Sequence, residues 1–225
     1  MKYTWLLFDA DDTLFDFAKA ESNALQWTLE QLGLPFQADY VPLYAHFNQQ
    51  VWQEFERGRL SSQELRVKRF KLFFEKVGLP GDMPAVSQLY LRNLALGTDL
   101  LDGADAVLHA LLPDYHLALV TNGLQDVQRP RLLGSRLRDC FEQVFISEEI
   151  GAAKPTRAYF DAVFAALGQP VRESVLIIGD SLSSDIKGGL DYGIDACWYN
   201  PKGKITDLPV TYQIRHLDQL AEVIK

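Results

Sequence analysis

The sequence FDADDTL, at residues 8–14, places three carboxylates directly after the apolar run at residues 4–8. A bulky apolar run suits a strand that is buried on both faces. Carboxylates at the end of such a strand are costly unless a cation or a proton compensates them. Because side chains alternate along a strand, we expect Asp9 and Asp11 on the same side, at the carboxyl end where open α/β sheets bind ligands.

The same stretch also has a purely structural interpretation. Asp11 and Asp12 would cap a helix and Asp9 would form a turn, since aspartate favours both positions. The stretch taken alone does not separate the two interpretations, so the rest of the chain decides between them.

The composition is that of a globular protein, and it argues against some classes of partner. The chain has 225 residues, 48% of them hydrophobic and 23% charged, and a net charge of −8. This charge argues against non-specific nucleic-acid binding, because no basic excess is available for phosphate backbones. Two cysteines, Cys140 and Cys197, are too few for a disulfide framework, which predicts a reducing cytoplasm.

We also expect no membrane segment. Asp9 interrupts the first apolar run too early for a signal peptide. No later stretch has the roughly 18 uncharged apolar residues that a membrane span needs. The expected protein is cytoplasmic, and its oligomeric state stays open between monomer and homodimer.

Two patterns divide the chain. The first is a succession of helices without a strand, expected at residues 18–33, 38–57, 61–77 and 83–96, where Ser61 and Glu64 have the spacing of a capping box. The second is an alternation of helices at 103–112, 124–134, 156–168, 183–192 and 217–224 with strands at 116–121, 144–146, 175–178, 196–199 and 212–214.

Alternating strands and helices imply right-handed crossovers and a mostly parallel, doubly wound sheet. The first strand belongs to that sheet, so the helical block is an insertion. The expected fold class is therefore α/β, with a Rossmann-like core at residues 1–15 and 98–225 and an all-helical cap at residues 16–97.

Polar residues stand at or near the carboxyl ends of the expected core strands. Because these ends share one edge of a parallel sheet, we expect their side chains on one rim. The residues are Asp9, Asp11, Thr121, Asn122, Lys154, Asp180 and Asp185.

These residue types suit phosphoryl transfer. Asp9 could attack phosphorus and form an aspartyl-phosphate. Asp11 could protonate the leaving oxygen and later deprotonate water. Lys154 would neutralise the phosphate and the nucleophile, and Thr121 with nearby backbone N–H groups could hold phosphate oxygens. Asp180, with Asp9, offers the hard oxygen ligands that Mg²⁺ prefers.

Several of these residues also have an ordinary alternative. Lys154 could be exposed at a helix start, the stretch at 121–123 could be a plain turn, and Asp185 could be a first-turn acid favoured by the helix dipole. A carboxylate at Asp180, after a wholly apolar strand, needs a partner in either case.

As an ordered set, these motifs resemble the haloacid dehalogenase superfamily of aspartyl-phosphate phosphatases. The matching pieces are FDADDTLF at 8–15, VTNG at 120–123, KP at 154–155 and GDSLSSD at 179–185. The resemblance implies that Asp9 is the nucleophile and Asp11 the acid/base. An acid at this second position suits phosphatases and phosphomutases, because the dehalogenating members carry no acid there and the ATPase pumps carry threonine.

The resemblance also implies the ligands. Thr121 and Lys154 would bind the phosphoryl group, with Asn122 as a further candidate beside them. Mg²⁺, or Mn²⁺ as the alternative, would be held by Asp9, the backbone carbonyl of Asp11, and Asp180. Asp185 would lie close to the ion or behind it.

The length of the cap is similar to that of the house-cleaning nucleotidases, which hydrolyse nucleoside 5'-monophosphates, often pyrimidine ones. A small phosphorylated metabolite, above all a nucleotide, is the implied substrate. Aromatic residues of the expected cap could stack a base, although their helical spacing favours a place in the cap core: Tyr44, Phe47 and Trp52. Basic residues there could reach an anionic substrate, although a solvated face is the ordinary place for them: Arg66, Lys68 and Arg69.

Two other functions stay open. A sugar-phosphate phosphatase or phosphomutase would share Asp9 and Asp11, and a mutase would return the phosphoryl group to the substrate. A non-catalytic phospho-receiver module also combines acids, threonine and lysine on a sheet rim. Such modules are shorter, however, and a long cap over the site would not suit recognition by a partner.

Overall fold

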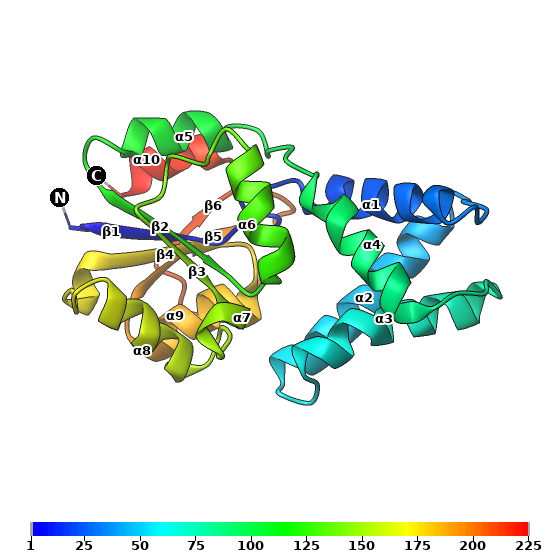
Figure 1. Ribbon diagram of the computed structural model, residues 1–225. Coiled ribbons are helices and arrows are strands. Elements are labelled where there is room, and N and C mark those ends of the chain that lie inside the picture. The colour runs from blue at the N-terminus through cyan, green and yellow to red at the C-terminus, as the bar shows by residue number, and fades with distance from the viewer. Residues whose placement is uncertain (1, 225) are drawn as a thin grey trace.

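The computed structural model describes residues 2–224 and contains a six-stranded parallel sheet beside a group of helices (Figure 1). The strands are β1 (Trp5–Phe8), β2 (His116–Thr121), β3 (Gln143–Ile146), β4 (Val175–Gly179), β5 (Asp195–Tyr199) and β6 (Tyr212–Ile214), in the order β3-β2-β1-β4-β5-β6. β1 lies in the middle, with Phe8 beside Leu119 of β2 and Ile178 of β4. The predicted doubly wound α/β core is confirmed.

Helices cover both faces of the sheet, because neighbouring side chains of a strand point to opposite faces. On one face, Leu6 and Phe8 pack with α5 (Ala104–Leu111) and α10 (Leu220–Val223). On the other, Leu7 and Ile177 pack with α8 (Arg157–Ala166) and α9 (Lys187–Tyr192). The two layers lie above and below the sheet in Figure 1. This burial on both faces explains the apolar strands.

Four consecutive helices form the inserted cap between β1 and α5. They are α1 (Phe17–Gln31), α2 (Tyr40–Glu56), α3 (Ser62–Val77) and α4 (Met83–Ala95). They enclose an apolar cluster of their own, in which the ring of Tyr44 stacks on that of Phe70. The expected capping box is present: Glu64 N donates to Ser61 Oγ at 3.2 Å, and Ser61 N donates to Glu64 Oε2 at 2.8 Å.

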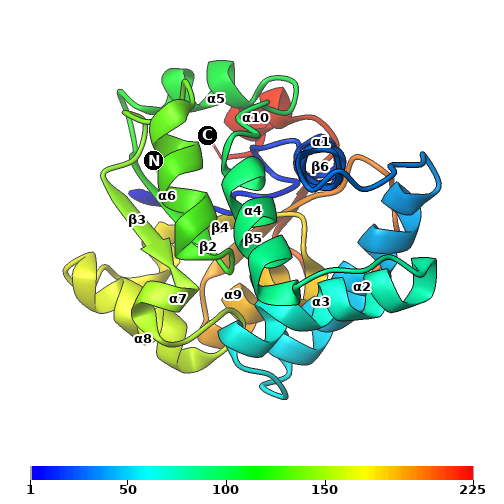
Figure 2. The ribbon, with the colours of Figure 1, turned by 45° about the vertical axis from the view of Figure 1, so that its right-hand side comes forward.

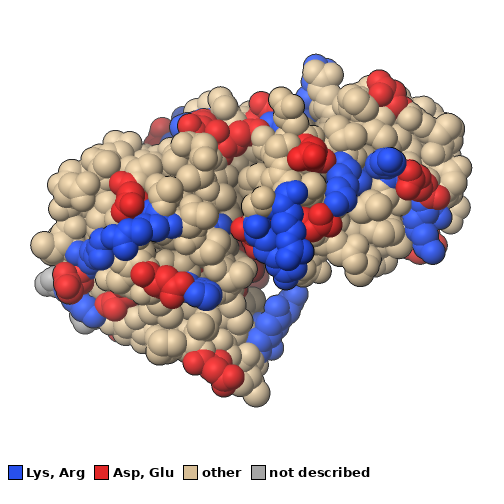
Figure 3. Space-filling model, turned by 90° about the horizontal axis from the view of Figure 1, so that it is seen from below, with Lys and Arg blue, Asp and Glu red and all other residues tan. Residues whose placement is uncertain are grey.

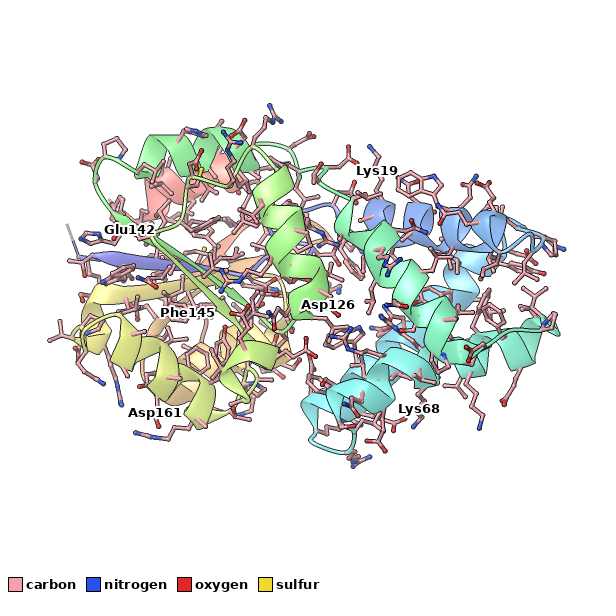
Figure 4. All side chains as sticks on the ribbon, in the orientation of Figure 1. Lys19, Lys68, Asp126, Glu142, Phe145 and Asp161 are labelled. Atoms are coloured by element: carbon pink, nitrogen blue, oxygen red, sulfur yellow. The ribbon has the colours of Figure 1, made fainter. Side chains whose placement is uncertain are left out.

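The cap meets the core along α6 (Gln125–Gly134), which lies next to α4 in Figures 1 and 2. Leu124 and Val127 of the core complete the apolar cluster of the cap. Arg66 of α3 forms ion pairs at 2.9 Å with Asp126 and with Glu148, and Figure 4 shows Asp126 at the end of α6 that faces the cap. The contact between cap and core is therefore part apolar and part ionic.

The chain departs from the expected elements in four places. A short helix, α7 (Ser147–Ile150), follows β3, where no element was predicted. Residues Leu182–Ile186 form a π-helix before α9, and Ile186 N donates to Ser181 O at 3.1 Å. The closing helix is a 3₁₀ turn, Leu217–Gln219, followed by α10, and another 3₁₀ turn, Arg172–Ser174, precedes β4. Among the described residues, no helix combines the length and hydropathy required to cross a bilayer.

Candidate active site

Lys154 joins the carboxyl end of β1 to the segment after β4. Its Nζ donates to Asp9 Oδ1 at 2.7 Å, to Asp185 Oδ1 at 2.6 Å and to the carbonyl of Val120 at 2.8 Å. The side chain is only 1% exposed, so these bonds satisfy all three of its donors away from water. The alternative of an exposed lysine at a helix start is wrong.

The charges around Lys154 do not balance. Burial and the neighbouring Asp185 raise the pKa of Asp9 well above its usual range, although Lys154 opposes the shift. Burial lowers the pKa of Lys154, but Asp185 and Asp9 outweigh it, and the net shift is upward. The lysine therefore stays an ammonium at neutral pH, facing more carboxylates than it can neutralise.

Asp180 is the carboxylate that remains uncompensated. No described residue donates a hydrogen bond to its side chain, whereas Trp198 Nε1 holds its backbone carbonyl at 2.9 Å. Burial and the charge of Asp185 raise the pKa of Asp180 to about 7. Oxygens of Asp9, Asp180 and Asp185 lie within 4.8 Å of one another. An excess of closely spaced, poorly compensated carboxylate oxygens fits a hard divalent cation such as Mg²⁺.

Both oxygens of Asp185 already have partners in the protein. Lys154 occupies Oδ1, and Ser181 N donates to Oδ2 at 3.1 Å. The approach requires glycine at position 179, because a Cβ there would lie 2.2 Å from Asp185 Oδ2. Asp185 thus holds Lys154 and the loop after β4, and whether it contacts a metal directly stays a prediction.

Asp11 is directed at α6. Gln128 Nε2 donates to its Oδ2 at 2.6 Å, and the guanidinium of Arg131 forms an ion pair with its Oδ1. The chain turns tightly here, since the N–H groups of Leu14 and Phe15 both donate to Ala10 O at 2.9 Å. The first acid to cap a helix is Asp16, which accepts from Lys19 N, and not Asp11 or Asp12.

Gln128 and Arg131 were missed in the sequence analysis. Both are buried, at 2% and 0% exposure, although they belong to a polar helix. Their spacing of three residues does put them on one helix face, which is the only signal that the sequence offers. Spacing alone says nothing about what that face contacts.

Thr121 and Asn122 lie at the end of β2, on the same edge of the sheet. Thr121 is 1% exposed, and its Oγ1 accepts a hydrogen bond from Gly123 N at 3.0 Å. The Asn122 amide bonds twice to the backbone of Lys154: Nδ2 donates to its carbonyl and Oδ1 accepts from its N–H, both at 2.8 Å. Asn122 therefore positions Lys154. The phosphate-binding roles of both residues stay predictions.

Open space lies on several sides of this rim. A cavity of about 500 Å³ separates Phe55 and Glu56 of the cap from Glu148 and Thr156 of the core. Another, of about 350 Å³, adjoins Asp12, Asp180 and Lys202. Glu56 also reaches across to the site and accepts from Ser183 Oγ at 3.5 Å. Seen from below in Figure 3, acidic and basic side chains are interleaved along the boundary between core and cap.

The cap residues that were candidates for contacting the substrate lie in different surroundings. Tyr44 is fully buried in the cap core, whereas Trp52 lines a small cavity beside Asp11. Lys68 pairs with Glu54 at 2.7 Å on the surface of the cap. The solvated-face interpretation is wrong for Arg69, which is 1% exposed.

Comparison with known proteins identifies the family of this chain. A model of the haloacid dehalogenase-like hydrolases matches residues 3–193. The chain belongs to the haloacid dehalogenase-like hydrolase family. It is 39% identical to the HAD-hydrolase YfnB of Bacillus subtilis, over 99% of this chain and 96% of that protein.

Two pyrimidine 5'-nucleotidases are also similar to this hydrolase. PynA of Streptococcus pneumoniae is 36% identical over 100% of this chain and 96% of its own. YjjG of Escherichia coli is 32% identical over 100% and 99%. The resemblance predicted from the four motifs is confirmed.

Solved structures agree with the family assignment. The crystal structure of YfnB, bound to magnesium, covers the whole of both chains with a TM-score of 0.94 and 38% identity, and it reveals interdomain movement in that protein. L-2-haloacid dehalogenase of Xanthobacter autotrophicus covers 99% of this chain and 98% of its own with a TM-score of 0.76 at 17% identity, which shows the shared fold alone.

Proposed function

We propose that this hydrolase is a Mg²⁺-dependent phosphomonoesterase that forms an aspartyl-phosphate on Asp9. The observation that supports this most strongly is the buried ammonium of Lys154, 2.7 Å from Asp9 Oδ1. Lys154 occupies Oδ1, so Oδ2 is the oxygen that attacks phosphorus. A carboxylate positioned by a buried cation at the carboxyl end of a central strand suits nucleophilic catalysis.

The reaction has two steps. Asp9 Oδ2 bonds to phosphorus while the ester P–O bond breaks, and Asp11 gives its proton to the leaving oxygen. Water then attacks phosphorus and gives a proton to Asp11, while the bond between phosphorus and Asp9 breaks and releases phosphate. Gln128 and Arg131 position the carboxylate of Asp11. Thr121 donates to a phosphoryl oxygen, and the positive charge of Lys154 neutralises the phosphoryl group and the nucleophile.

The metal would be held by Asp9, Asp180 and the backbone carbonyl of Asp11, with Asp185 behind them. When bound, Mg²⁺, or Mn²⁺ in its place, supplies positive charge to the phosphoryl oxygens. The raised pKa of Asp180, to about 7, and the absence of a described donor to its side chain support a cation at this position.

The substrate we propose is a pyrimidine nucleoside 5'-monophosphate. PynA and YjjG, which act on pyrimidine nucleotides by their names, align with the whole of this chain. We place the boundaries of the cap near residues 16 and 97. The two ends of the cap pack closely there, since a Cβ at Gly97 would lie 2.4 Å from the Cβ of Ala20. The cytoplasmic location and the choice between monomer and homodimer stay predictions.

The test is inorganic phosphate release from UMP, ribose 5-phosphate and a hexose phosphate, each with and without Mg²⁺. The proposal predicts turnover of UMP that needs Mg²⁺ and is abolished in Asp9→Asn. An isomerised hexose phosphate without phosphate release would indicate a mutase. A long-lived phosphoprotein without turnover would indicate a receiver module.

A further inference from the structure

A small cavity lies between the cap and the core beside Asp11. Its volume is about 20 Å³, enough for a single water molecule. Phe17, Trp52 and Arg69 of the cap line it together with Gln128 of α6.

Arg69, which lines this cavity, has two donors without a partner among the described residues. Its Nη1 donates to Asn48 Oδ1 at 3.0 Å, and Asn48 Nδ2 in turn donates to Glu21 at 2.7 Å. The guanidinium lies 5.1 Å from the ring centroids of both Phe70 and Tyr90, which fixes its position. Its Nε and Nη2 are buried and have no hydrogen-bond partner among the described residues.

Gln128 brings an unused acceptor. Its Nε2 is bonded to Asp11, but its Oε1 is buried without a described donor. Leaving a buried polar group unpaired costs about 1–3 kcal/mol. Two donors and one acceptor on residues that line one cavity would be satisfied together by a ligand that accepts from Arg69 and donates to Gln128.

We infer that Arg69 and Gln128 recognise the imide edge of a uracil or thymine base, which rests on the proposed function. A carbonyl oxygen of the base has two lone pairs for Nε and Nη2 of Arg69, and the neighbouring N3–H donates to Gln128 Oε1. Cytosine has an acceptor at N3, where Gln128 requires a donor. Trp52 also lines the cavity and offers an aromatic face on which the base can stack. The cavity holds no more than a water molecule, so the base enters only when the cap moves away from α6.

The protein-side test compares UMP with ribose 5-phosphate, which lacks a base. Arg69→Met keeps an unbranched apolar chain between Phe70 and Tyr90 but removes the donors. It should lower kcat/KM for UMP about 10- to 100-fold, as expected for the loss of hydrogen bonds from a charged group. The kcat/KM for ribose 5-phosphate should change less than about 3-fold. Lys68→Met, one residue away on the same helix, removes a cation that pairs with Glu54 and should change neither value.

The substrate-side test uses the unaltered enzyme, so it does not depend on the folding of a variant. UMP methylated at N3 and CMP should each have kcat/KM at least about 10-fold below that of UMP, because each leaves a buried polar group unpaired. Equal kcat/KM for UMP, CMP and ribose 5-phosphate would overturn the inference. So would an equal loss on UMP and ribose 5-phosphate in Arg69→Met. If the enzyme releases phosphate from none of these substrates, the proposed function is overturned instead.

Discussion

The guanidinium of Arg131 forms an ion pair with the carboxylate of Asp11 from a fully buried position. Its Nη2 also donates to the carbonyl of Leu94, in the cap, at 3.4 Å. The same guanidinium lies over the rings of Phe15 and Phe17, where the chain passes from core to cap. Arg131 therefore contacts the proposed acid/base, the cap and the segment that joins it to the core.

Arg131→Met should impair substrates that need a proton on the leaving group. We expect kcat for UMP to fall about 10- to 100-fold, since general acid–base catalysis contributes about 10²–10⁴-fold and Asp11 would lose the ion pair that positions it. p-Nitrophenyl phosphate, whose leaving group departs without a proton, should be much less affected. Arg129→Met removes an exposed arginine of the same helix that pairs with Glu149 and should leave both rates unchanged. An equal loss on both substrates would exclude this role.

Lys154→Met should destabilise the protein in the absence of metal. The change leaves the buried carboxylates of Asp9 and Asp185 without their cation, which costs about 3–5 kcal/mol. Urea unfolding in EDTA measures this loss, and added Mg²⁺ should restore part of it. Lys187→Met, which breaks an exposed pair with Asp191, should cost no more than about 0.5 kcal/mol. An unfolding free energy equal to that of the parent protein in EDTA would show that Lys154 does not compensate the cluster.

Glu21 makes the stability of the cap depend on pH. Burial raises its pKa from 4.5 to about 7, against the opposing effects of Asn48 and Arg69. A raised carboxyl pKa stabilises the fold at low pH, and this contribution is lost as the pH rises from 4.5 to 7.

Glu21→Gln removes this dependence. Relative to the parent protein, the variant should gain about 2 kcal/mol of unfolding free energy as the pH rises from about 5 to about 8. Urea unfolding at the two values measures the gain. Glu75→Gln, at an exposed position of α3, serves as the control. If the unfolding free energies of the variant and the parent protein differ by the same amount at both pH values, the pKa of Glu21 is not raised by burial.

Gly179→Ala should disturb the site without removing any of its charged groups. The new Cβ would lie 2.2 Å from Asp185 Oδ2 and 2.6 Å from its Cβ, so Asp185 would have to move away from Lys154. We expect kcat to fall about 10-fold or more, by analogy with other small misplacements in active sites. Gly134→Ala meets only Thr98 at 3.5 Å, an ordinary contact, and should be neutral. Full activity in Gly179→Ala would show that the position of Asp185 is unimportant.

The central part of the site could be predicted from the sequence because it depends on topology alone. Asp9 and Asp180 follow apolar strands, and the carboxyl ends of neighbouring parallel strands necessarily share an edge. Lys154 lies on the segment that follows β3 and α7, at the same edge of the sheet, with β2 between β3 and β1. Once the alternation of strands and helices indicated a parallel sheet, the proximity of these three side chains followed.

The surroundings of Asp11 and the cap pocket could not be predicted in this way. The direction of Gln128 and Arg131 depends on how α6 is rotated against the sheet, and helical periodicity does not determine that rotation. Arg69 is near Arg66 and Lys68 in the sequence, which suggests a solvated face. It is buried because Phe70 and the distant Tyr90 enclose it. The π-helix after β4 likewise depends on Ser181 accepting a bond from Ile186.

The most direct test of the account is to trap the covalent intermediate. The enzyme is mixed with UMP and Mg²⁺, quenched, and reduced with borohydride, which converts an aspartyl-phosphate to homoserine. Peptide mass spectrometry should then find homoserine at position 9, and none in Asp9→Asn or without substrate. Phosphate release by Asp9→Asn, or homoserine at another aspartate in place of Asp9, would contradict the assignment of Asp9 as the nucleophile.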